Sequence, residues 1–339
     1  MDQSSHVESS FAEEDPGLDL PLRPKTLSDF VGQEEVCKRL EVFMGAAKKR
    51  GEPLGHALFS GPPGLGKTTL ANIIAKTMGT SIVVSSGPLL EKPSDLAGIL
   101  TNLQEGDVFF IDEIHRLPRN VEEYLYPAME DFVLNLMIDS GPNARSVQVN
   151  LSWFTLIGAT TRSGLLTSPM RSRFPFTCRL QYYTPDTLEK ILSRSASLLS
   201  FIVDNQGVKE IATRARGTPR IANNLLRWVR DYAQMHPSPT VDRDLVQKAL
   251  AMLAIDHRGL DEMDKKILSV LIDHYKGGPV GLSTLAVAVG EERQTLEEVY
   301  EPFLILEGFI QRTPRGRMAT ELAYRHLGKE TLLSSEESS

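Results

Sequence analysis

The feature that most constrains this chain is the glycine-rich run from Gly61 to Thr68, GPPGLGKT, which matches the pattern Gly-x4-Gly-Lys-Thr. Such loops turn successive backbone N–H groups inward around phosphate oxygens. Lys67 can reach the β- and γ-phosphates, and the hydroxyl of Thr68 can ligate Mg²⁺. A buried strand before the loop (Ala57 to Phe59) and a helix after it (Leu70 to Met78) would aim a helix N-terminus at the phosphates. The run predicts a nucleoside-triphosphate site in an α/β domain.

An apolar run that ends in two acids follows downstream. Val108 to Ile111 is apolar and β-prone, and Asp112 and Glu113 come directly after it. A buried parallel strand would deliver both carboxylates to the carboxyl edge of the sheet. We expect Asp112 to hold Mg²⁺ through water and Glu113 to polarise an attacking water, which predicts ATP hydrolysis. For His115, a position on the surface or beside the site is favoured over a catalytic role.

Length and cysteine content narrow the class of protein. A chain of 339 residues can form two or three domains with their own cores. Cys37 and Cys178 lie far apart without metal-ligand spacing, so we expect a reducing compartment and no metal cluster. No apolar stretch approaches the roughly 18 residues of a membrane span, and residues 1–20 do not resemble a signal peptide. These features predict a cytoplasmic protein.

The two ends and the overall charge bear on nucleic-acid binding. Residues 1–20 hold six acids and no Lys or Arg, and residues 329–339 are rich in Ser and Glu, so both are predicted to be disordered tails. The net charge of −7 argues superficially against a nucleic-acid partner. A local basic stripe can nevertheless bind phosphates on an acidic protein.

Such a stripe lies between Gly308 and Lys329, a segment that contains five basic residues and only one acidic residue. Helical spacing before it predicts helices at about 261–275, at 285–289 and from about 294, with Pro302 kinking or restarting the last one. Phe309 to Ala319 is typical of a hairpin with its tip at Pro314 to Gly316. Helix-turn-helix followed by a basic hairpin indicates a winged-helix domain.

The arginines of this region are candidate phosphate contacts. Arg312 and Arg317 in the wing and Arg293 at the start of the second helix would contact duplex DNA. Binding without base specificity is favoured, because the second helix also carries several acids that would repel a groove. A winged helix that contacts another protein remains the alternative.

A helical region separates the two ends. Residues 185–199, 208–216, 220–235 and 241–253 each have helical spacing. A small all-α domain after a phosphate-loop domain typically forms a lid over the nucleotide. Arg220, next to Pro219 at a helix start, is placed to reach the phosphates.

A hairpin is also predicted inside the ATPase domain, at about 131–151. Phe132, Leu134, Leu136 and Ile138 alternate toward a turn, and the apolar residues of the returning segment alternate back. Leu136, Met137 and Ile138 form a contiguous apolar patch. From the pattern alone, an edge hairpin packed on its own domain is favoured over a docking surface.

Together these segments resemble the RuvB family, the bacterial Holliday junction branch migration motors of the AAA+ ATPase superfamily, over about residues 20–328. The resemblance rests on segments at 22–24, 30–33, 61–68, 112–117, 158–162, 170–174, 217–220 and 312–317. It implies an AAA+ P-loop domain with a parallel sheet and an inserted β-hairpin at 21–183. It further implies a small all-α lid domain at 184–255 and a C-terminal winged-helix domain at 256–328.

The resemblance also assigns roles to residues. It implies that Thr161 orients the attacking water, that Arg173 is an arginine finger acting on the neighbouring subunit, and that Arg220 is the sensor arginine of the lid. The residues implied to contact ATP are Leu22, Arg23, Gly64, Gly66, Lys67, Thr68, Thr69, Glu130, Asp131, Phe132 and Tyr183. Thr68 and Asp112 would hold Mg²⁺.

The implied partners follow from the family. They are duplex DNA at Holliday junctions, RuvA docked on the hairpin at Leu136, Met137 and Ile138, and RuvC in the wider complex. The implied assembly is a hexameric ring, and the implied processes are recombination, DNA repair and the SOS response. A clamp-loader-like ATPase switch is the alternative, although clamp-loader subunits normally end in a helical collar. Two features depart from the family pattern: the acidic N-terminal extension, and Pro175-Phe176 where a glycine is expected.

Overall fold

The computed structural model describes residues 20–137, 146–236 and 240–329. By internal contacts the chain divides into two compact units, residues 1–200 with 217–224 and residues 201–216 with 225–339. This division does not follow the three predicted domain ranges, whose boundaries stay a prediction. The predicted disorder of 1–20 and 329–339 falls almost wholly outside the described residues.

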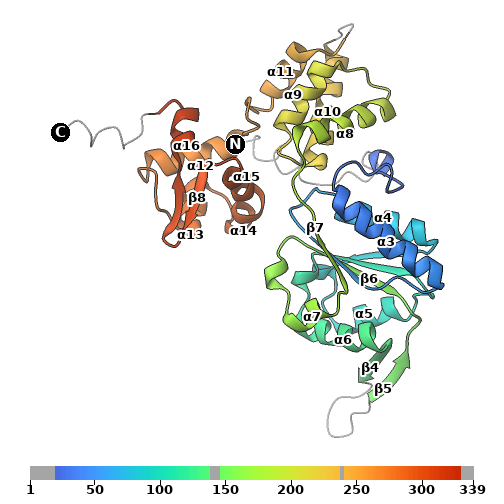
Figure 1. Ribbon diagram of the computed structural model, residues 1–339. Coiled ribbons are helices and arrows are strands. Elements are labelled where there is room, and N and C mark those ends of the chain that lie inside the picture. Colours follow the sequence, from blue (N-terminus) through green and yellow to red (C-terminus); the bar gives the residue numbers. More distant parts are fainter. Residues whose placement is uncertain (1–19, 138–145, 237–239, 330–339) are drawn as a thin grey trace. The chain divides into compact units, whose positions relative to one another are not determined.

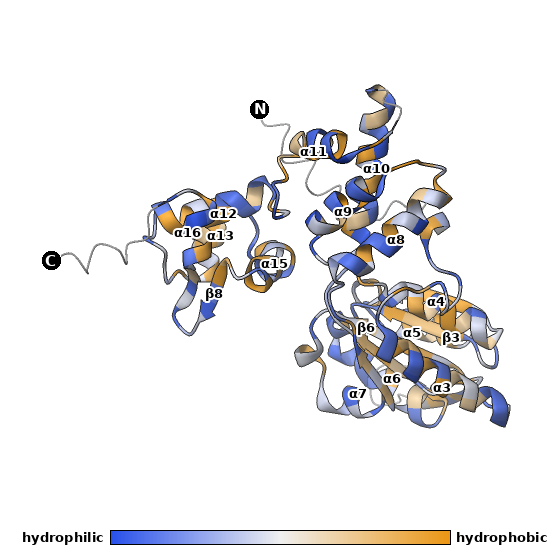
Figure 2. Cartoon of the chain, turned by 45° about the horizontal axis from the view of Figure 1, so that its top comes forward, coloured by the Kyte–Doolittle hydropathy of each residue, from blue (hydrophilic) through white to orange (hydrophobic). Residues whose placement is uncertain are grey.

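A five-stranded parallel sheet forms the centre of the first unit. Its strand order is β2-β3-β6-β1-β7, and every neighbouring pair is parallel. The strands are β1 (Ala57–Ser60), β2 (Ile82–Ser86), β3 (Val108–Asp112), β6 (Thr155–Thr160) and β7 (Phe176–Arg179). The three central strands are buried nearly throughout, as hydrophobic runs covered on both faces require, and Figure 2 shows the apolar character of β3. Their carboxyl ends share one edge, where ligands bind in open α/β sheets.

Helices cover both faces of this sheet (Figure 1). On one face lie α3 (Glu34–Arg50) and α4 (Lys67–Met78), and on the other α5 (Pro93–Leu100), α6 (Arg119–Glu130) and α7 (Ser168–Ser172). A buried cluster joins the second set of helices to the sheet, with Leu125 and Met170 packed among side chains of β1, β3 and β6. The described part of this unit also contains four 3-10 turns: η1 (Leu20–Leu22), η2 (Gly87–Leu89), η3 (Ile114–Arg116) and η4 (Ser163–Leu165).

The predicted hairpin is present as a separate two-stranded sheet. β4 (Val133–Met137) pairs antiparallel with β5 (Ser146–Asn150), with Leu134 opposite Val149 and Leu136 opposite Val147. Leu134 is fully buried, which anchors the base of the hairpin in the domain core. Ile138 lies outside the described residues, and the side chains of Leu136 and Met137 are not described. The docking patch therefore stays a prediction.

The lid helices begin with side-chain caps. These helices are α8 (Pro185–Leu198), α9 (Asn205–Arg214), α10 (Pro219–Met235) and α11 (Arg243–Ala251). The side chains of Thr184, Asp204 and Asp242 accept hydrogen bonds from backbone amides at the starts of α8, α9 and α11. In the second unit α9 packs against α11.

The winged helix has its own core in the second unit. Its elements are α12 (Glu262–Asp273), α13 (Leu282–Val289), α14 (Arg293–Thr295), the π-helical η5 (Leu296–Tyr300), α15 (Glu301–Leu306), β8 (Ile310–Thr313), β9 (Gly316–Ala319) and α16 (Glu321–His326). Pro302 lies in the first turn of α15, where the backbone stays helical and only the helix type changes, from the π-helical η5 to α15. Gly316 has φ +140°, and a Cβ there would lie 2.3 Å from the carbonyl oxygen of Val280, so only glycine fits at the start of β9.

Candidate active site

The glycine-rich loop lies between β1 and α4, at the carboxyl edge of the sheet. Gly61, Gly64 and Gly66 all have positive φ values, which L-residues with side chains rarely adopt. A Cβ on Gly61 would lie 2.6 Å from the carbonyl oxygen of Leu180, and one on Gly66 would lie 2.9 Å from the ring of Phe30. The loop can therefore keep this path only with glycine at these positions.

The side chain of Lys67 is hydrogen-bonded to its own loop. Its Nζ donates to the carbonyl oxygens of Gly61 at 2.8 Å and Pro62 at 2.9 Å, and the residue is 7% exposed. Burial lowers the pKa of Lys67, while the nearby carboxylates of Asp112 and Glu113 act in the opposite direction. The ammonium group is thus held by weak neutral acceptors, which phosphate oxygens can replace.

The acidic pair stands at the end of β3, beside the loop. Glu113 has a left-handed backbone, with φ 46°, and its amide donates to Oδ1 of Asp112 at 2.9 Å. Thr161, directly after β6, donates its hydroxyl to Oε2 of Glu113 at 3.0 Å. The predicted water-polarising and water-orienting residues are therefore in direct contact.

His115 contacts the same carboxylate. Its Nδ1 lies 3.1 Å from Oε2 of Glu113 and 2.9 Å from the hydroxyl of Thr160, and its side chain is 6% exposed. The surface position considered for it is wrong, whereas the position beside the site is confirmed. Its proximity follows from the parallel pairing of β3 with β6, which the sequence pattern does not specify.

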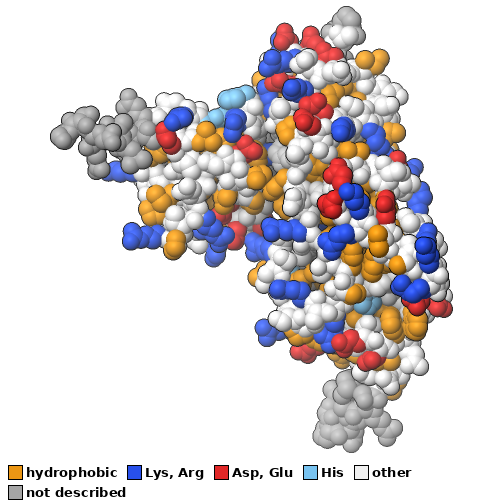
Figure 3. All heavy atoms as spheres, viewed as in Figure 1, with side chains coloured by type: hydrophobic (Ala, Val, Ile, Leu, Met, Phe, Trp, Pro, Cys, Tyr) orange, Lys and Arg blue, Asp and Glu red, His pale blue; other side chains and the backbone are white. Residues whose placement is uncertain are grey.

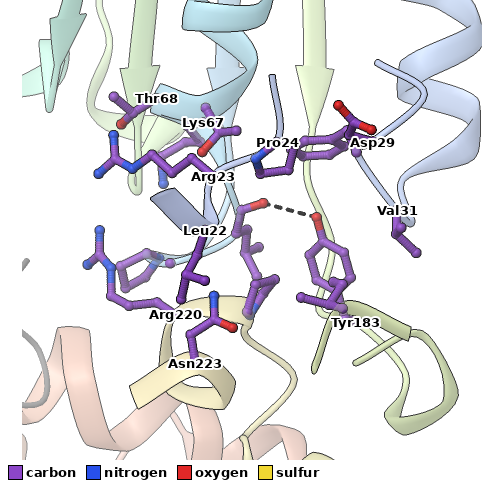
Figure 4. Close-up of a pocket in the computed structure, with 18 of the residues that line it drawn as sticks. Leu22, Arg23, Pro24, Asp29, Val31, Lys67, Thr68, Tyr183, Arg220 and Asn223 are labelled. Carbon is purple, nitrogen blue, oxygen red and sulfur yellow. Dashed lines mark hydrogen bonds between the residues drawn. The ribbon is translucent and has the colours of Figure 1, made fainter. Parts of the chain in front are cut away.

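A pocket gathers most of the predicted nucleotide contacts (Figure 4). Leu22, Arg23, Gly64, Gly66, Lys67, Thr68, Thr69, Asp112, Glu113, Tyr183 and Arg220 all line it. Tyr183 is buried, donates its hydroxyl to the carbonyl oxygen of Leu65 at 3.2 Å, and has its pKa raised by burial. Arg220 reaches the pocket from the start of α10, next to Gly64.

Several lining residues were not predicted from the sequence. Ile191 and Arg194 lie on the same face of α8, and Asn223 lies one turn after Arg220 on α10. Nη1 of Arg194 donates to the carbonyl oxygen of Leu22 at 2.8 Å and so fixes the segment that closes the pocket. Helical spacing marks these residues as facing one side of their helices, but only the folded lid shows what that side faces.

Arg173 lies elsewhere, at the C-terminus of α7. Among the described residues, Arg173, Glu130, Asp131 and Phe132 are absent from the pocket lining. Nη2 of Arg173 lies 2.9 Å from Oε2 of Glu130, while Phe132 packs against Trp153 and Phe154. None of these four residues lines this pocket, so their predicted nucleotide contacts stay predictions. Pro175-Phe176 leads into β7, where the ring of Phe176 stacks on Phe43.

The predicted phosphate contacts in the winged helix differ in exposure. Arg293 is exposed at the start of α14, and Arg312 is 61% exposed, 3.9 Å from Glu297. Arg317 instead is buried and makes a two-pronged ion pair with buried Glu301, Nε to Oε1 at 3.0 Å and Nη2 to Oε2 at 2.9 Å.

The difference lies in the partner acid and not in the hairpin register. Arg312 and Arg317 are directly opposite each other across the hairpin, so both side chains project from the same face, toward acids one helical turn apart. A phosphate contact by Arg317 would require its pair with Glu301 to open, and its predicted role in DNA binding stays a prediction. Figure 3 shows Lys and Arg side chains on the surface of the winged helix. Arg315, in the same hairpin, is also exposed.

The fold and the pocket define a class of protein: a P-loop ATPase of the AAA+ type, with a lid that supplies an arginine to the nucleotide pocket and a C-terminal winged helix. Comparison with known proteins gives the particular family. Models described as the Holliday junction DNA helicase RuvB P-loop domain, the RuvB AAA lid domain and the RuvB C-terminal winged helix domain match residues 22–180, 183–256 and 257–328. The chain belongs to the RuvB family.

Individual relatives cover nearly the whole chain. It is 61% identical over 321 residues to the Holliday junction branch migration complex subunit RuvB of Protochlamydia amoebophila, which covers 95% of this chain and 97% of the relative. The corresponding protein of Flavobacterium johnsoniae is 62% identical over 316 residues, or 93% of each chain. The solved Thermotoga maritima RuvB Holliday junction branch migration motor has a TM-score of 0.84 at 52% identity, covering 91% of this chain and 99% of that one.

Proposed function

We propose that this chain is the ATP-driven motor subunit of a Holliday junction branch migration complex, acting in homologous recombination and DNA repair. The observation that carries the proposal is one pocket that gathers Lys67, Thr68, Asp112, Glu113 and Arg220. The names of the relatives support the choice of substrate. The winged helix supports a DNA motor over a clamp-loader-like switch.

In the proposed reaction, the pocket holds ATP and positions water. The loop amides and Lys67 bind the β- and γ-phosphates, and Lys67 exchanges its bonds with Gly61 and Pro62 for bonds to phosphate oxygens. Glu113 polarises the attacking water and Thr161, already bonded to it, helps to orient that water. Arg220 adds a positive charge from the lid.

The donor set suits Mg²⁺. The hydroxyl of Thr68 and the carboxylate of Asp112 are hard oxygen donors and line the same pocket. Together with phosphate oxygens and water they would hold the ion, which would neutralise charge on the phosphates during hydrolysis. Among the described residues there is no group of three or more His, Cys, Asp and Glu side chains that could hold a metal ion by themselves.

Arg173 is proposed to act on the nucleotide of a neighbouring subunit in a hexameric ring, with Glu130, Asp131 and Phe132 contacting the same nucleotide. Two observations support this. All four are missing from the pocket lining among the described residues, and Arg173 and Glu130 are in direct contact, so they would approach a neighbour together. An arginine supplied in this way neutralises charge that develops in the transition state.

The remaining parts of the proposal concern partners and location. We assign duplex DNA to the winged helix, RuvA to the hairpin at 131–151, and RuvC to the wider complex. A cytoplasmic location and a part in the SOS response belong to the same proposal. The described residues contain no helix long and apolar enough to cross a membrane.

The test is branch migration of synthetic four-way DNA junctions with RuvA and ATP. We expect wild-type protein to dissociate the junctions and Glu113→Gln protein to leave them intact, because the variant keeps the phosphate loop but loses the water-polarising carboxylate. ATP hydrolysis should rise when duplex DNA and RuvA are added. If duplex DNA and RuvA left the rate of ATP hydrolysis unchanged and no junction dissociated, the clamp-loader-like switch would be favoured.

A further inference from the structure

The orientation of Arg173 depends on a very short helix. α7 has five residues, Ser168–Ser172, and Arg173 is its C-cap. Helices this short are unstable alone in water, so α7 is held by its contacts with the rest of the domain. Met170 anchors it in the core, where it is almost fully buried. Whatever else fixes α7 also fixes the direction in which Arg173 leaves it.

A second anchor is a group of hydrogen bonds between α7 and α6. The hydroxyl of Thr167, the N-cap of α7, accepts a bond from the amide of Met170 and donates to Oε1 of Glu122. The hydroxyl of Tyr126, one turn beyond Glu122 on α6, donates to the same oxygen at 2.7 Å and lies 3.2 Å from the hydroxyl of Thr167. Glu122 is buried, so its carboxylate ties the start of α7 to Tyr126.

The ring of Tyr126 then supports the arginine itself. Cζ of Arg173 lies 4.4 Å from the centre of this ring, within the range of a cation–π interaction. The bonds of its hydroxyl hold the far end of the ring, so the side chain cannot swing away from the guanidinium group. The side chain of Arg173 is 18% exposed, and its Nε is buried with no acceptor among the described residues. Its head group is held by a ring face, by Glu130 and by the carbonyl oxygen of Pro169.

We propose that Tyr126, fixed by Glu122 and Thr167, is a positioning residue that holds Arg173 for its action on the neighbouring subunit. The inference rests on the proposed role of Arg173 and extends it to residues on α6. Tyr126 lies outside the lining of the pocket in its own chain, so it acts through Arg173 and not on bound nucleotide. Loss of the ring should lower turnover without changing how the chain's own pocket binds ATP.

The first experiment measures ATP hydrolysis by the full-length protein with duplex DNA and RuvA. Tyr126→Leu removes the ring and should lower kcat about tenfold, from the usual range of cation–π energies, with KM for ATP little changed. Tyr126→Phe keeps the ring and should retain most of the turnover. Tyr124→Leu, the same substitution two residues away on α6, is the matched control and should behave as wild type. Unchanged kcat for Tyr126→Leu overturns the proposal.

Two further measurements separate positioning from a general structural effect. In an Arg173→Ala background, Tyr126→Leu should cause no additional loss, since the residue on which it acts is gone. Mixed oligomers of Tyr126→Leu and Lys67→Ala subunits should regain activity, because some interfaces pair an intact loop with an intact Tyr126. An additional loss in the first test, or no recovery in the second, overturns the proposal.

A parallel mixture of Arg173→Ala and Lys67→Ala subunits tests the role of Arg173 separately from the role of Tyr126. Recovery in this mixture but not in the Tyr126→Leu mixture means that Arg173 acts on its neighbour while Tyr126 serves its own subunit. No recovery in either mixture means that the proposed role of Arg173 is itself wrong.

Discussion

The nucleotide pocket and the winged helix both contain buried cations, but they hold them in different ways. Lys67 donates to two carbonyl oxygens of its own loop, neutral acceptors that it can exchange for phosphate. Arg317 is bonded through two nitrogens to Glu301, a carboxylate that is itself buried. Moving Arg317 to a ligand would leave a buried charge without a partner, which is costly. A cation held by neutral acceptors is available to a ligand, whereas one held by a buried anion serves the fold.

The largest expected effects lie in the pocket. Lys67→Ala should abolish ATP binding, because it removes the cation that meets the β- and γ-phosphates, whereas Glu113→Gln should bind ATP and fail to hydrolyse it. Binding of a fluorescent ATP analogue and release of phosphate measure the two effects. Normal turnover by Glu113→Gln would show that another group polarises the water.

Arg173→Ala comes next, with turnover expected to fall roughly 10³-fold, as for other arginine fingers. ATP binding should persist, since Arg173 lies outside the pocket lining of its own chain. Phosphate release at saturating ATP measures the loss, and recovery in mixtures with Lys67→Ala subunits identifies action between subunits. A large loss of ATP affinity would instead place Arg173 in its own site.

The contrast between the regions also explains what the sequence could predict. The motif around Gly61 to Thr68 has a required geometry, so Lys67 and Thr68 lie where the pattern places them. The acids after β3 follow from the rule that parallel strands share a carboxyl edge. The basic stripe has no such required geometry. Alternation along the hairpin indicates that Arg312 and Arg317 share a face, but not which of the two meets a buried partner. The burial of Arg317 depends on Glu301, which lies sixteen residues earlier on a helix that packs against the hairpin.

The contacts of Arg194 and Tyr126 were not predicted from the sequence, for a related reason. Arg194 bonds to Leu22 across a sequence separation of 172 residues, and Tyr126 meets Arg173 only because α6 and α7 pack on the same face of the sheet. Neither residue belongs to a motif with a fixed spacing. Long-range packing, which periodicity does not encode, brings both to their sites.

Arg317→Ala tests the structural side of the comparison. Removing one partner of a buried ion pair should destabilise the winged helix by about 3 kcal/mol, since Glu301 would remain buried without its cation. Urea denaturation of the full-length protein measures the loss. Arg325→Ala, which removes an exposed pair with Glu321, is the matched control and should have little effect. Unchanged stability with weaker DNA binding would return Arg317 to the set of phosphate contacts.

Arg312→Ala should have the smallest effect and tests the exposed side of the wing. Because Arg312 is 61% exposed and only distantly paired with Glu297, its guanidinium group is available to duplex phosphates. Its loss should weaken binding about equally for unrelated duplex sequences, since phosphate contacts carry no sequence information. The plot of log affinity against log salt should flatten by about one unit, because one fewer counterion is released on binding.

Hydrolysis without DNA should stay at the wild-type rate, since Arg312 lies in the winged helix and not in the pocket lining. Fluorescence anisotropy over a range of salt concentrations measures the slope, with Arg325→Ala as a control for the loss of a surface charge. An unchanged slope and affinity would show that the wing does not grip DNA through Arg312, and the winged helix would then be better explained as a surface for protein contacts.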